Sequence, residues 1–166
     1  MKDRFVRVVF LGTLCAGLFW SWHWLFPGPE RVIRKQLSEL AAAASITPNE
    51  APLVKLAKAQ QLCAFFANDA TVTVDVPGRS VQTFNGREEI QQAAIGARAI
   101  LNTLKVEFVD VNVAVGTDKK SAVAHLTATA TLPGEKVPEV QELEIGFTNI
   151  DREWRINHAQ TVKTLR

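Results

Sequence analysis

The sequence has few residues suited to covalent or metal chemistry. Its 166 residues include two cysteines, three histidines and no tyrosine. Cys15 lies in an apolar N-terminal run and Cys63 in a predicted helix, so we expect no disulfide between them and a fold held by packing. No His or Cys spacing matches a zinc site, and there is no glycine-rich phosphate loop. We therefore expect neither a metal nor a cofactor.

The chain also has no marked excess of either charge. It has 19 Lys and Arg against 17 Asp and Glu, and these residues are interspersed. Nucleic-acid-binding domains carry basic patches, so a nucleic acid is not an expected partner. With 47% hydrophobic residues, the chain is long enough for one globular domain with a proper core and an additional segment.

The additional segment is an apolar run from Val8 to Phe26. Its length is about the 18 to 20 residues that cross a bilayer, and it is followed by the helix-breaking sequence Pro27-Gly28-Pro29. Basic residues precede the run and tryptophans lie near its end, where indoles favour the headgroup region. These residues are Lys2, Arg4 and Arg7, and Trp20, Trp22 and Trp24.

This pattern predicts a single-pass membrane anchor over residues 1–28 and a separate domain over residues 29–166. The charge asymmetry places the domain on the far side, in the periplasm of a bacterial inner membrane or outside the cell. A cleaved secretory signal is the alternative, but the small-x-small cleavage pattern is missing after the run.

Three helices are predicted in the domain. Pro29 suits the first position of a helix, and apolar residues recur at helical spacing to about Ala44. A second helix is predicted from Pro52 to about Phe66, and a third from Gly86 to about Leu101 after a capping box formed by Asn85 and Glu88. The expected inner stripe of the second helix comprises Leu53, Leu56, Ala59, Cys63 and Phe66.

Alternating apolar and polar residues predict the strands. Residues 71–76 and 81–84 form a hairpin around Pro77-Gly78, and residues 104–162 form a four-strand antiparallel meander. In the first meander strand, alternation places Val109, Val111, Val113 and Val115 on one face and Phe108, Asp110 and Asn112 on the other. Later in the sheet, the inner face is expected to carry Phe147, Trp154, Ile156, His158 and Gln160, and the outer face His125, Glu142 and Glu144.

In this order of elements the chain resembles the nuclear transport factor two-like superfamily, which includes SnoaL-like polyketide cyclases and ketosteroid isomerases. Three stretches carry the resemblance, which covers about residues 29–163: AFFANDATV at 64–72, FNGREEI at 84–90 and EWRINH at 153–158. The resemblance implies a cone-shaped α+β domain of the cystatin-like type. Three helices would pack on a curved, mostly antiparallel sheet with a pocket between them, and such domains are commonly dimeric.

Activity follows less directly from the resemblance, because one fold hosts many functions. In isomerase-like members a carboxylate after Ala-Thr-Val serves as general base. Matching Ala70-Thr71-Val72 puts Val74 in that slot, and Asp75 follows one residue later on the opposite face of the strand. The chain also lacks the tyrosine that helps to hold an enolate oxygen in such sites.

His158 is the foremost candidate for chemistry on the predicted inner face. It could act as a general base or contact a ligand, or it could simply pack near the edge of the sheet. Gln160 could orient a polar ligand group or line the cavity rim. Trp154 and Phe147 would either belong to the core or form walls of an open pocket.

The predicted outer face, with His125, Glu142 and Glu144, suits a homodimer interface better than an active site. A metal site joining His125 to either glutamate is not supported by their spacing.

Two functions remain open. The first is a membrane-anchored extracytoplasmic module that binds a small apolar ligand or partner proteins without catalysis, an architecture that is similar to inner-membrane assembly proteins of type IV secretion. The alternative is a SnoaL-like isomerase, cyclase or hydratase acting on a small apolar carbonyl compound, with His158, either alone or together with Asp75, as the acid/base group. A third possibility is a pocket filled by its own side chains, which would leave only a dimerisation module.

Overall fold

The computed structural model describes residues 28–75, 80–132, 134 and 137–162. The apolar run from Val8 to Phe26 lies outside these residues, so the membrane anchor stays a prediction. Within the described part of the chain, no helix is both long and apolar enough to cross a membrane.

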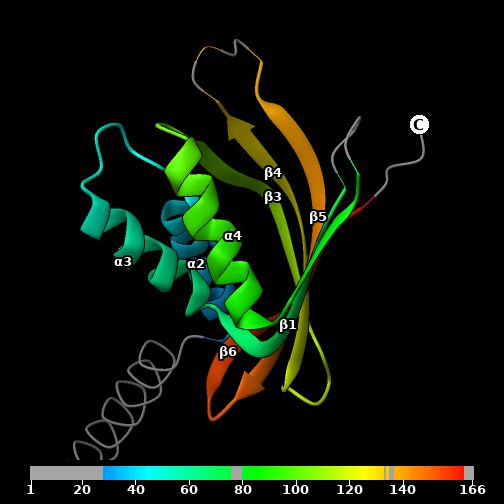
Figure 1. Ribbon diagram of the computed structural model, residues 1–166. Helices are drawn as coiled ribbons and strands as arrows, with labels where there is room; N and C mark the ends of the chain where they lie inside the picture. Colours follow the sequence, from blue (N-terminus) through cyan, green and yellow to red (C-terminus); the bar gives the residue numbers. More distant parts are fainter. Residues whose placement is uncertain (1–27, 76–79, 133, 135–136, 163–166) are drawn as a thin grey trace, which may run out of the picture.

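Three helices form one layer of the domain (Figure 1). They are α2 (Pro29–Ala44), α3 (Pro52–Cys63) and α4 (Gly86–Ile100). Proline occupies the start of both α2 and α3, where its missing N–H costs no hydrogen bond. All three helices lie on the same side of the sheet, so the other face of the sheet carries no helix among the described elements.

Six strands form the second layer, a single curved sheet. They are β1 (Phe66–Val74), β2 (Gln82–Asn85), β3 (Lys105–Val115), β4 (Ser121–Thr131), β5 (Glu139–Ile150) and β6 (Glu153–Thr161). Their spatial order is β2-β1-β6-β5-β4-β3. β1 and β6 run parallel, and the other neighbours are antiparallel. The predicted α+β architecture is therefore confirmed.

The hydrophobic core fills the space between the helices and the sheet. Its largest fully buried side chains are Ile33 and Leu37 from α2, Phe147 from β5 and Ile156 from β6. The small residues Ala122 and Ala124 on β4 are buried in this core, on the inner face that the alternation in that strand predicted.

The boundary between α3 and β1 differs from the prediction. α3 ends at Cys63, and β1 already begins at Phe66. Ala59 and Cys63 are buried as expected, but Leu53 and Leu56 are exposed. The reason is that α3 packs on the neighbouring helices α2 and α4, so its N-terminal half covers no part of the sheet.

The predicted cap of α4 is correct in position but differs in its contacts. Asn85 is the N-cap residue, yet its side chain makes no capping hydrogen bond. Its backbone N–H donates to Glu89 Oε2 at 2.7 Å, so Glu89 takes the part expected of Glu88.

A bulge in β3 breaks the expected alternation. Asp110 has a φ of 52°, and the register with β4 shifts between Val109 and Asn112. A bulge adds one residue, so side chains before it change face relative to those after it. Val111 and Phe108 therefore both pack on the core, whereas Val109 is exposed on the other face. The expected placement of Phe108 and Val109 is wrong.

A second bulge lies in β6. Phe147 pairs with Ile156, but the next pair is Gly146 with His158, which leaves Asn157 without an opposite residue. Beyond this point Ala159 aligns with the inward-facing Ile145, and Gln160 aligns with the outward-facing Glu144. The expectation that His158 and Gln160 share the inner face with Trp154 is wrong.

The outer edge of the sheet is strand β3, and α2 and the residue after it cover its backbone. Ser45 Oγ accepts a hydrogen bond from the Val106 N–H at 3.0 Å. The Arg34 guanidinium donates to the Val111 carbonyl at the bulge. Ile46 and Leu104 exchange a pair of backbone hydrogen bonds. These contacts satisfy edge groups that would otherwise be available to another strand.

Candidate functional site

Polar side chains form a continuous row across the outer face of the sheet, the face without helices. One residue from each strand contributes, and each is the registered partner of the next. The polar row, from β2 to β3, comprises Thr83, Thr73, Gln160, Glu144, His125 and Asn112. His125 and Glu144 thus lie on the outer face as predicted, and Gln160 joins them there.

Glu144 lies at the centre of the polar row between two imidazoles. Its Oε2 is 3.9 Å from His125 Nε2, and its Oε1 is 3.6 Å from His158 Nε2. Gln160 Nε2 donates to the same Oε1 at 2.9 Å and fixes the carboxylate. The side chains of His125 and His158 are 58% and 41% exposed, so both imidazoles are accessible from solvent.

Gly146 makes this arrangement possible. It lies directly opposite His158, and a Cβ at Gly146 would be only 2.0 Å from His158 Cε1. The imidazole therefore lies over the glycine backbone, and its Nδ1 is 3.0 Å from Asn157 Oδ1. The bulge residue Asn157 thus both turns His158 outward and orients its ring.

Among the residues that the structure describes, the inner face of the sheet has no comparable cluster of polar groups. Phe147 is 1% exposed and Trp154 is 7% exposed, and both belong to the core. For Phe147 the structure favours core packing over a pocket wall, whereas Trp154 belongs to the core and also lines a groove beside α2. Of the four residues predicted to line one pocket, two are core residues and His158 and Gln160 face the other way.

The structure does not bring Asp75 and His158 together. Thr71 pairs with His158 and Thr73 with Gln160, and Asp75 follows the end of β1. At about 3.3 Å per residue, four residues separate the two positions by roughly 13 Å along the strands. The Asp75 N–H donates to Thr161 Oγ1 at 2.9 Å. The form of the isomerase hypothesis that uses Asp75 together with His158 is therefore not supported.

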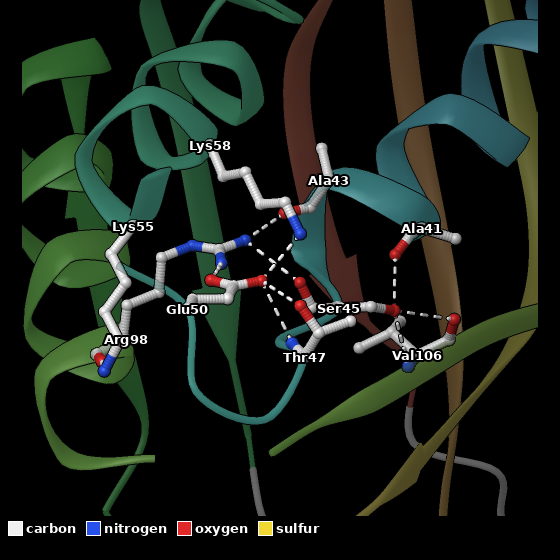
Figure 2. A network of polar contacts seen from close by, with 9 residues as sticks. All are labelled: Ala41, Ala43, Ser45, Thr47, Glu50, Lys55, Lys58, Arg98 and Val106. Atoms are coloured by element: carbon white, nitrogen blue, oxygen red, sulfur yellow. Dashed lines mark hydrogen bonds and ion pairs between the residues drawn. The ribbon is translucent and has the colours of Figure 1, made fainter. Parts of the chain in front are cut away.

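A second polar cluster, which no sequence pattern predicted, is buried between the helices (Figure 2). Arg98 on α4 donates to Glu50 Oε2 at 3.0 Å and to the carbonyls of Ala43 and Ser45 at the end of α2. Lys58 on α3 donates to Glu50 Oε1 at 2.6 Å. The side chains of Glu50 and Arg98 are 2% and 3% exposed, so this ion pair joins all three helices in the protein interior.

The carboxyl group of Glu50 has a strongly shifted pKa. Burial alone would raise its pKa, but the hydrogen bonds from Lys58 and from the Thr47 N–H and hydroxyl outweigh burial and lower the pKa to about 2. Perturbed carboxyl groups often mark active sites. Here both oxygens are occupied by protein donors, so the cluster is a structural joint between helices.

Cys63 shows no sign of reactivity. It is buried, and burial raises the pKa of its thiol even though the charge of Arg87 opposes this shift. Among the described residues, no group of three or more His, Cys, Asp or Glu side chains is arranged to hold a metal ion.

Comparisons with known proteins find similar structures at low sequence identity. An NTF2-like protein of unknown function from Pseudomonas putida KT2440 has a TM-score of 0.63 and 14% identity, over 82% of this chain and 87% of that one. An NTF2-like protein with a cystatin-like fold from Novosphingobium aromaticivorans has a TM-score of 0.58 and 19% identity, over 79% of this chain and 82% of that one.

The chain has the NTF2-like fold. A third similar structure, from Novosphingobium aromaticivorans, is named as a scytalone dehydratase. Its TM-score is 0.58 at 12% identity, over 82% of this chain and 84% of that one. No family model matches the sequence, and no curated protein matches it. The structural similarity establishes the NTF2-like fold. Because the sequence identities are low, the function must be argued from the site.

Proposed function

We propose that the protein is a membrane-anchored, extracytoplasmic interaction module of the NTF2-like type, which associates with a second copy of itself through the outer face of the sheet. One observation carries this proposal. Phe147 and Trp154, which were expected to line a ligand pocket on the inner face, are core residues, and the paired side chains of His125, Glu144 and His158 lie on the outer face.

The outer face has the dimensions of a protein interface. The sheet has five strands of 9 to 12 residues and the four-residue strand β2. With strands spaced by about 4.8 Å and residues by about 3.3 Å, its face has an area of roughly 800 Å². This is about the area that one partner contributes to a stable interface. No helix among the described elements competes for it.

The chemistry of the polar row suits pairing between two copies. A two-fold axis places the same row on both partners, so the imidazoles of one copy can meet the carboxylates of the other. A hollow of about 180 Å³ beside the row, lined in part by Asp110, His125 and Glu142, can receive a side chain of the partner. The catalytic alternative has no such support, because Asp75 and His158 are separated.

Val123 offers a direct test. It faces outward on β4, opposite Ala114 and Gly146. Val123→Arg would place an additional charge on the proposed interface, two residues from His125, where desolvation is costly. We expect the full-length chain in mild detergent to form a dimer in sedimentation experiments, and Val123→Arg to weaken the dimer at least about tenfold.

Gln60→Arg is the matched control, because it adds the same charge at an exposed position of α3 and should leave the dimer unchanged. Association through residues 8–26 alone would be insensitive to both substitutions. That result, or a wild-type chain that stays monomeric, would contradict the proposal.

A further inference from the structure

A groove of about 420 Å³ lies between α2, the end of α3 and the start of β6. Its apolar surface is formed by Val32, Ala64, Phe65 and Trp154. Its charged residues are Lys35, Glu39, Arg152, Glu153 and Arg155. An apolar surface beside charged groups suits an amphipathic ligand, and the volume is in the range of small-molecule sites.

The charges of the groove leave one cation in excess. Glu39 lies 3.6 Å from Lys35, and Glu153 forms an ion pair with Arg155. Arg152 is exposed and, within the described part of the chain, forms no ion pair. Its guanidinium, with five donors in a planar fork, is suited to a phosphate.

Two further charged residues belong to the surroundings of the groove. Arg31 lies one helical turn before Lys35 on the same side of α2, and it is exposed. Asp151 precedes Arg152 in the turn between β5 and β6. The charges of Arg31 and Asp151 cancel, so the net charge around the groove stays positive by one, with Lys35 and Arg152 as the cations best placed to bind an anion.

The groove lies at the end of the domain where the chain leaves toward the predicted anchor. Val32 is in the first turn of α2, and Figure 1 shows the β5–β6 turn at the end of the molecule where α2 begins. The anchor is predicted to end at Phe26, three residues before Pro29. Three steps of extended chain span about 10 Å, so this end would lie close to the headgroups.

We infer that this groove binds the headgroup of an anionic lipid from the membrane that holds residues 8–26. The inference rests on the membrane anchor of the proposed function, but it does not depend on self-association. Arg152 and Lys35 bind the lipid phosphate, and Val32 and Phe65 contact the apolar part next to it. Basic residues beside a membrane span are attracted to anionic headgroups in this way.

The test uses the full-length chain in lipid nanodiscs, made either of phosphatidylcholine alone or of phosphatidylcholine with a third of phosphatidylglycerol. Amide hydrogen exchange is followed at residues 30–40 and 151–156. We expect about threefold slower exchange in the anionic discs. The double variant Lys35→Gln/Arg152→Gln should lose this protection and keep the circular dichroism spectrum of the wild type.

The matched control is Lys119→Gln/Lys120→Gln, which removes two exposed cations from the β3–β4 turn, outside the groove. It should keep the protection. An equal loss of protection in both double variants would show that the lipid attracts the positive charge of the domain in general, and it would overturn the proposed site. Protection of the same size from inorganic phosphate in zwitterionic discs would also overturn it.

A separate measurement keeps the anchor distinct from the lipid site. If the chain stays in the discs through an alkaline wash but exchanges alike in both lipids, the anchor holds and the lipid site is refuted. If the chain leaves the discs, the anchor and the lipid site are both refuted.

Discussion

Replacement of Arg98 by methionine tests the joint between the helices. Arg98→Met removes the guanidinium that binds Glu50 and the carbonyls of Ala43 and Ser45, while keeping an unbranched side chain of similar length. Removal of one partner from a buried ion pair costs about 3–5 kcal/mol, because the other charge stays buried. Glu50 retains Lys58, so we expect a loss near the lower limit, about 3 kcal/mol.

The second step is a double-mutant cycle with Glu50→Gln. When both charges are removed, neither Arg98 nor Glu50 is left as an unpaired buried charge, and Lys58 is partly exposed to solvent. The double variant should therefore be more stable than the sum of the single effects predicts. For residues in direct contact such coupling is about 0.5–3 kcal/mol. Because Arg98 and Glu50 are both almost fully buried, we expect a value of at least about 1.5 kcal/mol.

The assay is a urea titration of the full-length chain in mild detergent, followed by circular dichroism. Arg31→Met is the control, because Arg31 is exposed on α2 and its removal should change the free energy of unfolding by less than about 0.5 kcal/mol. Additive effects in the cycle, or a loss below about 1 kcal/mol in Arg98→Met, would refute the structural role given to this pair.

Two further predictions concern single residues. Because the pKa of Glu50 is lowered from 4.5 to about 2 in the folded state, its contribution to stability is complete above about pH 4.5 and is lost as the pH falls toward 2. The difference in unfolding free energy between wild type and Glu50→Gln should therefore shrink over this range, and a constant difference would contradict the assignment. Gly146→Ala should force the His158 ring away from Glu144, because the new Cβ would lie 2.2 Å from Nδ1, and should destabilise the domain by about 1–3 kcal/mol. The NMR resonance of His158 Hε1 should shift in this variant and stay unchanged in the control Gly96→Ala, where no atom lies within 4 Å.

Most of the fold could be predicted because its signals are local and repeated. Helical spacing identified the three helices, and alternation identified the strands of the meander. The order of these elements then indicated the NTF2-like fold, which the similar structures support. The burial of α3 was less predictable, because apolar residues at helical spacing in its N-terminal half do not show whether the helix packs on a sheet.

The site was harder to predict because two bulges reverse side-chain direction. Alternation assumes that each strand is regular, and one extra residue at Asn157 moves His158 and Gln160 to the outer face. Asp110 tolerates a positive φ better than most residues, which was the only local hint of the bulge in β3. The buried pair of Glu50 and Arg98 depends on contacts between distant elements, which spacing in the sequence does not reveal.

The coverage of strand β3 by Ser45 and Arg34 limits how copies of this domain can assemble. An open edge of eleven residues would let one sheet continue into the next, and such addition produces fibres of indefinite length. The opposite edge strand, β2, has only four residues and offers little to extend. The proposed stacking through the sheet face would instead occupy that surface on both partners, so the proposed assembly would close at two copies and stay finite.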